Sequence, residues 1–197
     1  MSEVCIGLSP QSLEWCEGKM NPPGIRTHVF AIPKRDIVGW PTLPETITTN
    51  MKELVVFTGA FVLAENKKWQ KIKVLVERSP VTSASQGTKP SKTFVNSATF
   101  VHPGVEEDAT AFCRLANNDD YVYIIQTKPG KYRVIGNDMY QTETNPSQAL
   151  GASATDEMGT TLEITVTDIC PAPFYTGIIE TVDGDINAPD EGGGGST

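Results

Sequence analysis

Histidine is scarce in this sequence, and the common catalytic motifs are absent. The 197 residues contain two histidines, His28 and His102, far apart in the chain. General acid–base catalysis relies most often on histidine, because this side chain titrates closest to neutral pH. No G-x-S-x-G, G-x-x-x-x-G-K-[ST], H-E-x-x-H or G-x-G-x-x-G motif occurs. The sequence therefore predicts no catalytic residues, and the protein is not expected to be an enzyme.

Closely spaced metal ligands are also missing. Zinc sites usually contain ligand pairs such as C-x-x-C, whereas Cys5, Cys16, Cys113 and Cys170 are scattered. Residues 183–185, Asp-Gly-Asp, resemble part of a calcium loop but lack its alternating ligands and closing Glu. No metal site and no cofactor site is predicted. The spacing of Cys5 and Cys16 allows a disulfide, but a cytosolic product favours free thiols.

Long hydrophobic runs are absent. The longest, such as residues 55–64, are far shorter than the ~20 residues of a membrane helix. The first ten residues lack the basic and apolar regions of a secretory signal, so we expect a product of the cytosol with no membrane partner. Hydrophobic residues make up 39% and charged residues 20% of the chain, which is typical of a globular protein.

Basic residues are missing from the last third of the chain. All 16 Lys and Arg lie between Lys19 and Arg133, while residues 134–197 hold 11 of the 24 acids. Such an asymmetry fits a solvated acidic tail, complementary faces for self-association, or a surface that repels nucleic acid. Simple binding to duplex DNA is disfavoured, because it depends on Lys and Arg that neutralise phosphates. The basic run at residues 67–73 surrounds one Trp, and we interpret it as a strand with one solvated face.

Alternating apolar and polar residues indicate several strands. They are expected at residues 27–32, 53–63, 69–78, 93–101 and 160–167, with a hairpin over 120–135 around the turn Lys128-Pro129-Gly130-Lys131. Residues 105–117 predict one helix, because acids fill its first turn and Arg114 lies near its end. This pattern predicts an all-β or β-rich α+β fold: a β-sandwich or partly closed barrel with one flanking helix.

Three regions fall outside this strand pattern. Residues 1–24 are rich in Pro and Gly and are expected to form an irregular arm, followed by the β-domain at 25–176. Residues 177–197 are acidic and then Gly-rich, which predicts a disordered tail. Residues 79–92 are small and polar between two strands, and they predict a long mobile hairpin loop or an extended arm.

The order of these elements resembles the tail tube (major tail) proteins of tailed bacteriophages, in particular those of phages with Bacteroidetes hosts. The similarity covers residues 20–176. It is carried by the long polar hairpin loop, the helix, the hairpin YVYIIQTKPGKYRVIGN at 121–137, and the strand GTTLEITVT at 159–167.

The resemblance implies a structural virion protein that assembles into stacked hexameric rings. Strands of neighbouring subunits would join in one β-barrel through which DNA passes without specific binding. Glu163 would face the lumen, and the long loop and the termini would contact other subunits, with residues 1–24 as a second contact arm. The loop residues proposed for these contacts are Ser79, Pro80, Gln86, Gly87, Lys89, Pro90 and Lys92.

The resemblance also implies partners and a location. Partners would be other copies of the chain and other tail proteins: a terminator, a tape measure and, in contractile tails, a sheath. The protein would be assembled in the host cytoplasm and reside in the virion tail. The alternative is a monomeric β-sandwich for binding or adhesion, or another virion protein such as a head–tail connector or decoration protein. Oligomeric state separates these hypotheses.

Overall fold

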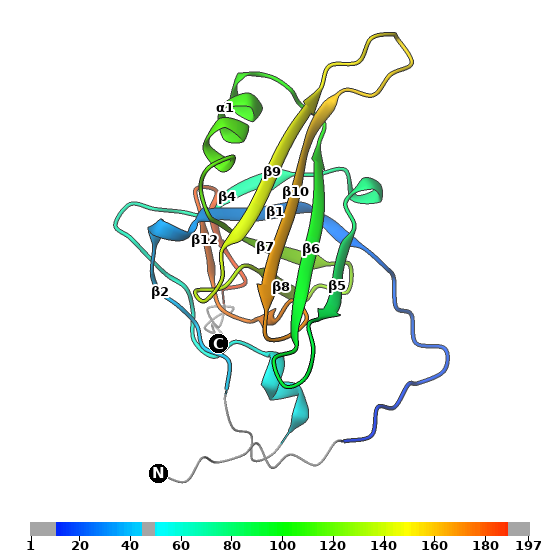
Figure 1. The fold of residues 1–197 in the computed structure, drawn as a ribbon, viewed down its shortest axis with the longest axis vertical. Coiled ribbons are helices and arrows are strands. Elements are labelled where there is room, and N and C mark those ends of the chain that lie inside the picture. Colours follow the sequence, from blue (N-terminus) through cyan, green and yellow to red (C-terminus); the bar gives the residue numbers. More distant parts are fainter. Residues whose placement is uncertain (1–10, 45–49, 189–197) are drawn as a thin grey trace, which may run out of the picture.

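The fold consists of two antiparallel sheets packed face to face, with one helix beside them (Figure 1). The computed structural model describes residues 11–44 and 50–188. The five-stranded sheet has the order β11-β8-β7-β1-β4, and its strands run across those of the four-stranded sheet, β5-β6-β10-β9. The bounds are β1 Ile25–Pro33, β4 Gln70–Lys73, β5 Val81–Gln86, β6 Thr93–His102, β7 Tyr121–Thr127, β8 Tyr132–Ile135, β9 Thr142–Ala149, β10 Gly159–Asp168 and β11 Phe174–Tyr175.

Smaller elements surround these sheets. The helix α1 packs beside β9, and two small two-stranded sheets pair β2 with β3 and β12 with β13. Their bounds are α1 Glu107–Ala116, β2 Ile37–Gly39, β3 Val62–Leu63, β12 Ile179–Thr181 and β13 Gly184–Ile186, and the 3₁₀ turns are η1 Lys34–Asp36, η2 Met51–Val55 and η3 Val76–Arg78.

The five-stranded sheet is buried on both faces. One face packs against the four-stranded sheet, where Val29 and Tyr123 meet Phe100 and Ile164. The other face is covered by loops and by the β12–β13 hairpin, and its core is built mainly from aromatic and aliphatic side chains, among them Phe30, Phe57, Phe61, Trp69 and Tyr175. A strand covered on both faces is apolar at successive positions. This explains why the first five residues of β7, Tyr-Val-Tyr-Ile-Ile, are all buried.

The mostly-β fold with one helix is confirmed. The predicted helix is α1, the predicted hairpin is β7–β8, and the alternating strand at 160–167 is β10. The four-stranded sheet has separate edges, β5 and β9, so the strands of the described residues do not close into a barrel.

The prediction of a long loop at residues 79–92 is wrong for residues 81–86. Residues 81–86 form β5, which pairs with β6 in an unbroken register, and only the turn at 87–92 joins the two strands. Backbone hydrogen bonds hold β5 in place, because most of its small side chains are exposed. A second polar stretch, residues 137–159, for which no strand is expected from the sequence, contains β9.

Two further expectations are corrected. Residues 53–63 were expected to form a strand, but most of this stretch is the η2 turn and a loop in which Gly59 has a φ of +89°. The tail expected from residue 177 begins with the β12–β13 hairpin, which packs against the core through fully buried Ile179. The backbone N–H of Trp69 also donates a hydrogen bond to the backbone carbonyl of Glu180. Residues 189–197 lie outside the described part of the chain.

Candidate functional site

The four-stranded sheet presents a polar face to solvent. Alternate residues of its strands point inward to the core, among them Phe100, Leu162 and Ile164. The residues between them form the face that we call the polar face. It is rich in Thr and Ser, carries two carboxylates and has no Lys or Arg; its members are Thr82, Ala84, Gln86, Thr93, Val95, Ser97, Thr99, Thr161, Glu163, Thr165, Thr167, Glu143, Asn145 and Ser147.

One edge of this sheet is β5. The Thr99 N–H donates to the carbonyl of Pro80, directly before β5, over 3.0 Å. In an antiparallel pair, residues that exchange hydrogen bonds alternate with residues whose backbone groups point away from the partner. The register of β5 with β6 has no shift. The N–H and C=O groups of Ser83 and Ser85 therefore point to the free edge.

The opposite edge is β9. The same alternation continues through β6 and β10, because neither of their registers is shifted. It directs the backbone groups of Thr142, Thr144 and Gln148 toward the free edge. The N of Pro146 also faces this edge, so the N–H that proline lacks is not one that would bond to β10. Near the end of β9, Thr110 of α1 donates to the Gln148 side chain over 3.2 Å. The open part of this edge is thus the first half of β9.

A groove of about 420 Å³ runs beside this open half. Its walls come from β9, from the exposed side of β10 and from residues 116–120 after α1. Asp119, Asp120 and Glu143 line it, which makes the groove acidic. Unpaired backbone groups at the rim of a groove are what strand addition requires. The geometry therefore suits an incoming β-strand that carries no acidic side chains.

The predicted contact residues are spread over different surroundings. Ser79 is buried, and its hydroxyl donates to the Leu75 carbonyl and accepts from the Val101 N–H, so it holds the chain before β5. The remaining positions lie on or beside the β5 edge: Pro80 precedes β5, Gln86 ends it on the polar face, and Gly87, Lys89, Pro90 and Lys92 form the exposed turn.

Glu163 and the edge residues complete this surface. Glu163 is exposed at the centre of the polar face, opposite Asn145 of β9 and Thr99 of β6. Sequence reasoning missed Ser83, Ser85, Thr142 and Thr144. Their only signal is the β-propensity of short Ser and Thr runs, which does not distinguish an edge strand from a loop.

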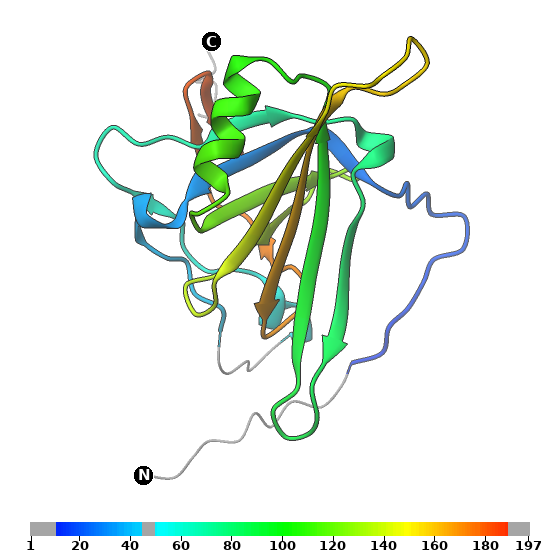
Figure 2. The same cartoon turned by 45° about the horizontal axis from the view of Figure 1, so that its top comes forward.

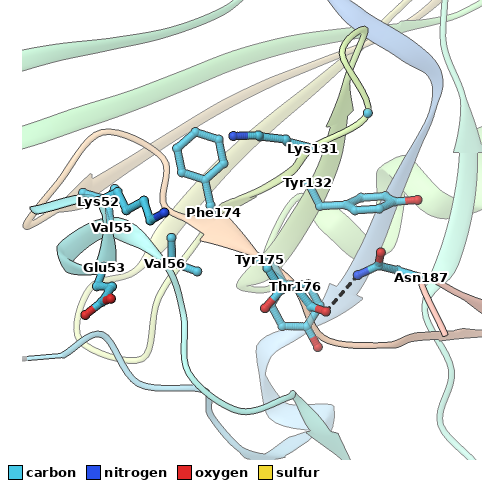
Figure 3. Close-up of a pocket in the computed structure, with 11 residues that line it drawn as sticks. Lys52, Glu53, Val55, Val56, Lys131, Tyr132, Phe174, Tyr175, Thr176 and Asn187 are labelled. Atoms are coloured by element: carbon cyan, nitrogen blue, oxygen red, sulfur yellow. Dashed lines mark hydrogen bonds between the residues drawn. The ribbon is translucent and has the colours of Figure 1, made fainter. Parts of the chain in front are cut away.

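An apolar pocket lies at another place, beside the edge strand β11 (Figure 3). It has a volume of about 490 Å³ and lies between η2 and the strands β8 and β11. Figure 3 shows Phe174 and Tyr132 on its walls, with Lys52 and Lys131 nearby. The Lys131 ammonium lies 5.4 Å from the centre of the Phe174 ring. The pocket thus combines an apolar interior with positive charge at its rim.

Both histidines lie beside Lys73 of β4, and within the described residues they make no hydrogen bond to each other. The His28 Nδ1 and the Thr27 Oγ1 are hydrogen-bonded over 3.0 Å. Burial lowers the pKa of His28, and the positive charges of Lys71 and Lys73 lower it further. The His102 Nδ1 lies 2.8 Å from the Lys73 carbonyl. Among the described residues, no three His, Cys, Asp or Glu side chains are placed to hold a metal ion.

Cys16, Cys113 and Cys170 are free thiols, and Cys5 lies outside the described residues. Within residues 11–44 and 50–188, no helix has the length and apolar character needed to cross a membrane.

Comparison of the chain with protein-family profiles, with curated proteins and with solved structures gives no match in any of the three. The features of the molecule that bear on function are the two free edges, the polar face and the apolar pocket.

Proposed function

We propose that the protein is a structural subunit that assembles edge to edge into hexameric rings, which stack into a tube of the phage-tail kind. The observation that carries this proposal is the polarity of the two free edges. Each of the three strand pairs in β5-β6-β10-β9 is antiparallel. Therefore β9 of one copy meets β5 of the next in antiparallel orientation, and a rotation about one axis repeats the contact around a ring.

The strand number fits a wide channel. Each copy adds four strands, so a ring of six copies is a closed 24-stranded barrel. Closed barrels of roughly 16–18 strands already leave an aqueous channel. From the usual strand spacing and tilt, the 24-stranded barrel is roughly 45 Å across between backbones. Closure also joins the two edges of the four-stranded sheet, which removes exposed N–H and C=O groups that otherwise favour aggregation.

In this arrangement the polar face lines the lumen. Its hydroxyl and amide side chains are wetted, while Glu143 and Glu163 are its charged residues. Carboxylates repel phosphates and release no counterions on contact. DNA would therefore pass through the channel without being held.

Charges beyond the strand ends favour the same pairing. When β5 pairs with the first half of β9 of a neighbour, the turn at 87–92 comes beside the residues that precede β9. Lys89 and Lys92 are exposed in this turn, and Asp120 and Asp138 lie near the start of β9. Opposite charges at the rim of an interface fix its register and increase the rate of association.

The wider biological setting follows from the same proposal. The ends of a tube need other tail proteins, a terminator and a tape measure, and a contractile tail adds a sheath. The subunit would be assembled in the host cytoplasm and reside in the virion.

A second candidate is a monomeric β-sandwich that binds another molecule. Pro146 favours it, because proline in an edge strand discourages pairing with other chains. In the tube, the same proline restricts pairing to the first half of β9.

Electron microscopy of the purified protein in negative stain, with sedimentation velocity over a range of concentrations, tests the proposal. Rings or hollow tubes are the expected result. A compact monomer at every concentration, including in the presence of preformed tail tips as an initiator, contradicts it and favours the monomeric binding module.

A further inference from the structure

The segment before β1 exposes three large apolar side chains. Residues 11–24 form an arm without helix or strand, and the arm loops away from the body of the protein (Figure 2). Leu13 is 87% exposed, Trp15 60% and Met20 86%. So many large apolar side chains in one short exposed segment usually mark a contact surface.

The pocket beside β11 has the opposite character. Val55, Val56, Tyr132 and Phe174 line it, and the residues around its opening are exposed. Its volume of about 490 Å³ lies within the range of ligand pockets, roughly 300–1,000 Å³, and accommodates an indole ring with a neighbouring aliphatic side chain. Tryptophan in a well-packed pocket is a common anchor of protein interfaces.

The charges on the two surfaces are complementary. Glu14 and Glu17 flank Trp15 in the arm, while Lys52 and Lys131 lie at the pocket. In the part of the chain that the structure describes, none of these four side chains has an ion-pair partner. Glu53, also at the pocket, is matched by Lys19 of the arm. The arm therefore carries a net negative charge and the pocket a net positive one, which favours their association.

We propose that the pocket beside β11 binds the arm of a second copy of this chain, with Trp15 as the anchor. The second copy is the occupant because Trp15 of the same chain does not line the pocket and is 60% exposed. Only the beginning of that arm approaches this region, where the Gln11 Oε1 accepts from the Met51 N–H. A patch on one surface and its complement on another give a head-to-tail contact between copies. This contact does not depend on pairing of the sheet edges.

A photo-crosslink locates the arm. Trp15 is replaced by p-benzoylphenylalanine in the full chain carrying Ser85→Pro, which blocks the β5 edge so that the outcome is separate from tube formation. Unlabelled and ¹⁵N-labelled chains are mixed, irradiated and digested. Crosslinked peptide pairs that combine a light arm with a heavy pocket segment at residues 130–134 or 174–176 are expected. Pairs from one chain only, or crosslinks elsewhere, overturn the proposal.

Substitutions measure its strength in the same Ser85→Pro background. Trp15→Ala is expected to weaken self-association by roughly tenfold or more in sedimentation equilibrium. The control is Leu150→Ala, which removes an exposed apolar side chain from the start of the loop between β9 and β10 and is expected to leave association unchanged. An unchanged association of Trp15→Ala overturns the proposal.

Charge reversal tests the pairing itself. Glu14→Lys with Glu17→Lys, or Lys52→Glu with Lys131→Glu, is expected to weaken association when each is present alone. A mixture of the two variants should recover it, because the arm of the first then matches the pocket of the second. Equal association of the mixture and of the separate variants contradicts docking through these charges.

Discussion

Asn96 and Asp168 form a hydrogen bond in the core of the sandwich, where the Asn96 Nδ2 donates to the Asp168 Oδ2 over 3.3 Å. Asn96 is fully buried, and its Oδ1 accepts from the Ser83 hydroxyl and the Ala172 N–H. The Ile169 N–H donates to the other Asp168 oxygen over 2.7 Å. One amide and one carboxylate thus tie the edge strand β5 to β6 and to the end of β10.

This arrangement makes stability depend on pH. Burial raises the pKa of Asp168, and the N–H donors around it oppose this shift only in part. The folded state binds the proton of the Asp168 carboxyl more tightly than the unfolded state does. The resulting contribution to the free energy of unfolding is fully present below the unfolded pKa of about 4, and it falls as pH rises through the folded pKa. Asp168→Asn removes this titration. The free energy of unfolding of the variant minus that of the wild type should therefore increase with pH above about 4, measured by urea unfolding. Parallel curves would contradict this prediction.

Tyr123 and Thr144 link the two sheets. The Tyr123 hydroxyl of β7 lies 2.9 Å from the Thr144 Oγ1 of β9, and both side chains are buried. Tyr123→Phe leaves the Thr144 hydroxyl without this partner, and we expect a loss of about 1–3 kcal/mol in the free energy of unfolding. The double variant Tyr123→Phe, Thr144→Val removes both polar groups and should recover part of the loss. A double variant less stable than Tyr123→Phe would show that the hydrogen bond is not the cause.

The cysteines should differ strongly in reactivity. Burial, with the nearby Asp168 carboxylate, raises the pKa of Cys170 to about 12. At pH 8 only about one Cys170 in 10,000 is then a thiolate, the form that reacts. Cys16 is exposed in the arm. Iodoacetamide should label Cys16 rapidly in the native protein and Cys170 only after unfolding, as read by peptide mass mapping. Equal native rates at the two sites would be inconsistent with the buried thiol.

The sequence predicts the strands that build the core. Ile164 and its neighbours alternate with polar residues along β10 because one face of that strand is buried and the other is wet. The turn at residues 128–131 marks the β7–β8 hairpin, and the acids before Ala109 mark the start of α1. In these elements, side-chain burial and local structure follow the same period.

The edge strands escape prediction for a physical reason. Most side chains of β5, Val-Thr-Ser-Ala-Ser-Gln, are exposed, so they carry no apolar period, and backbone bonds to β6 hold the strand. Pro146 argues against a strand until the order of the sheet shows that its N points to a free edge. Ile179 anchors an acidic hairpin that composition alone assigns to a tail. The candidate site depends on sheet order, which local patterns do not contain.

The polar face offers a test through its charge. Glu143→Lys with Glu163→Lys converts it from acidic to basic, and we expect duplex DNA to bind with an affinity that falls steeply with salt. Fluorescence anisotropy at several salt concentrations measures this, and the wild type should not bind. Glu65→Lys with Asp185→Lys changes the net charge equally at exposed positions off this sheet. If this control binds DNA as well as the first variant, net charge and not the polar face is responsible.

Ser85 provides the most direct test of edge pairing. Its N–H points away from β6, and it has no side-chain hydrogen bond in the described structure. Ser85→Pro should leave the folded subunit nearly as stable as Ser85→Ala, because the N–H that is lost does not bond to β6. The same variant should prevent rings and tubes in negative stain, because proline removes a donor from the free edge. Ala84→Pro is the contrasting variant. Its position bonds to β6, so it should lower the melting temperature of the subunit itself. Tubes formed by Ser85→Pro as readily as by Ser85→Ala would mean that β5 is not the edge through which subunits join.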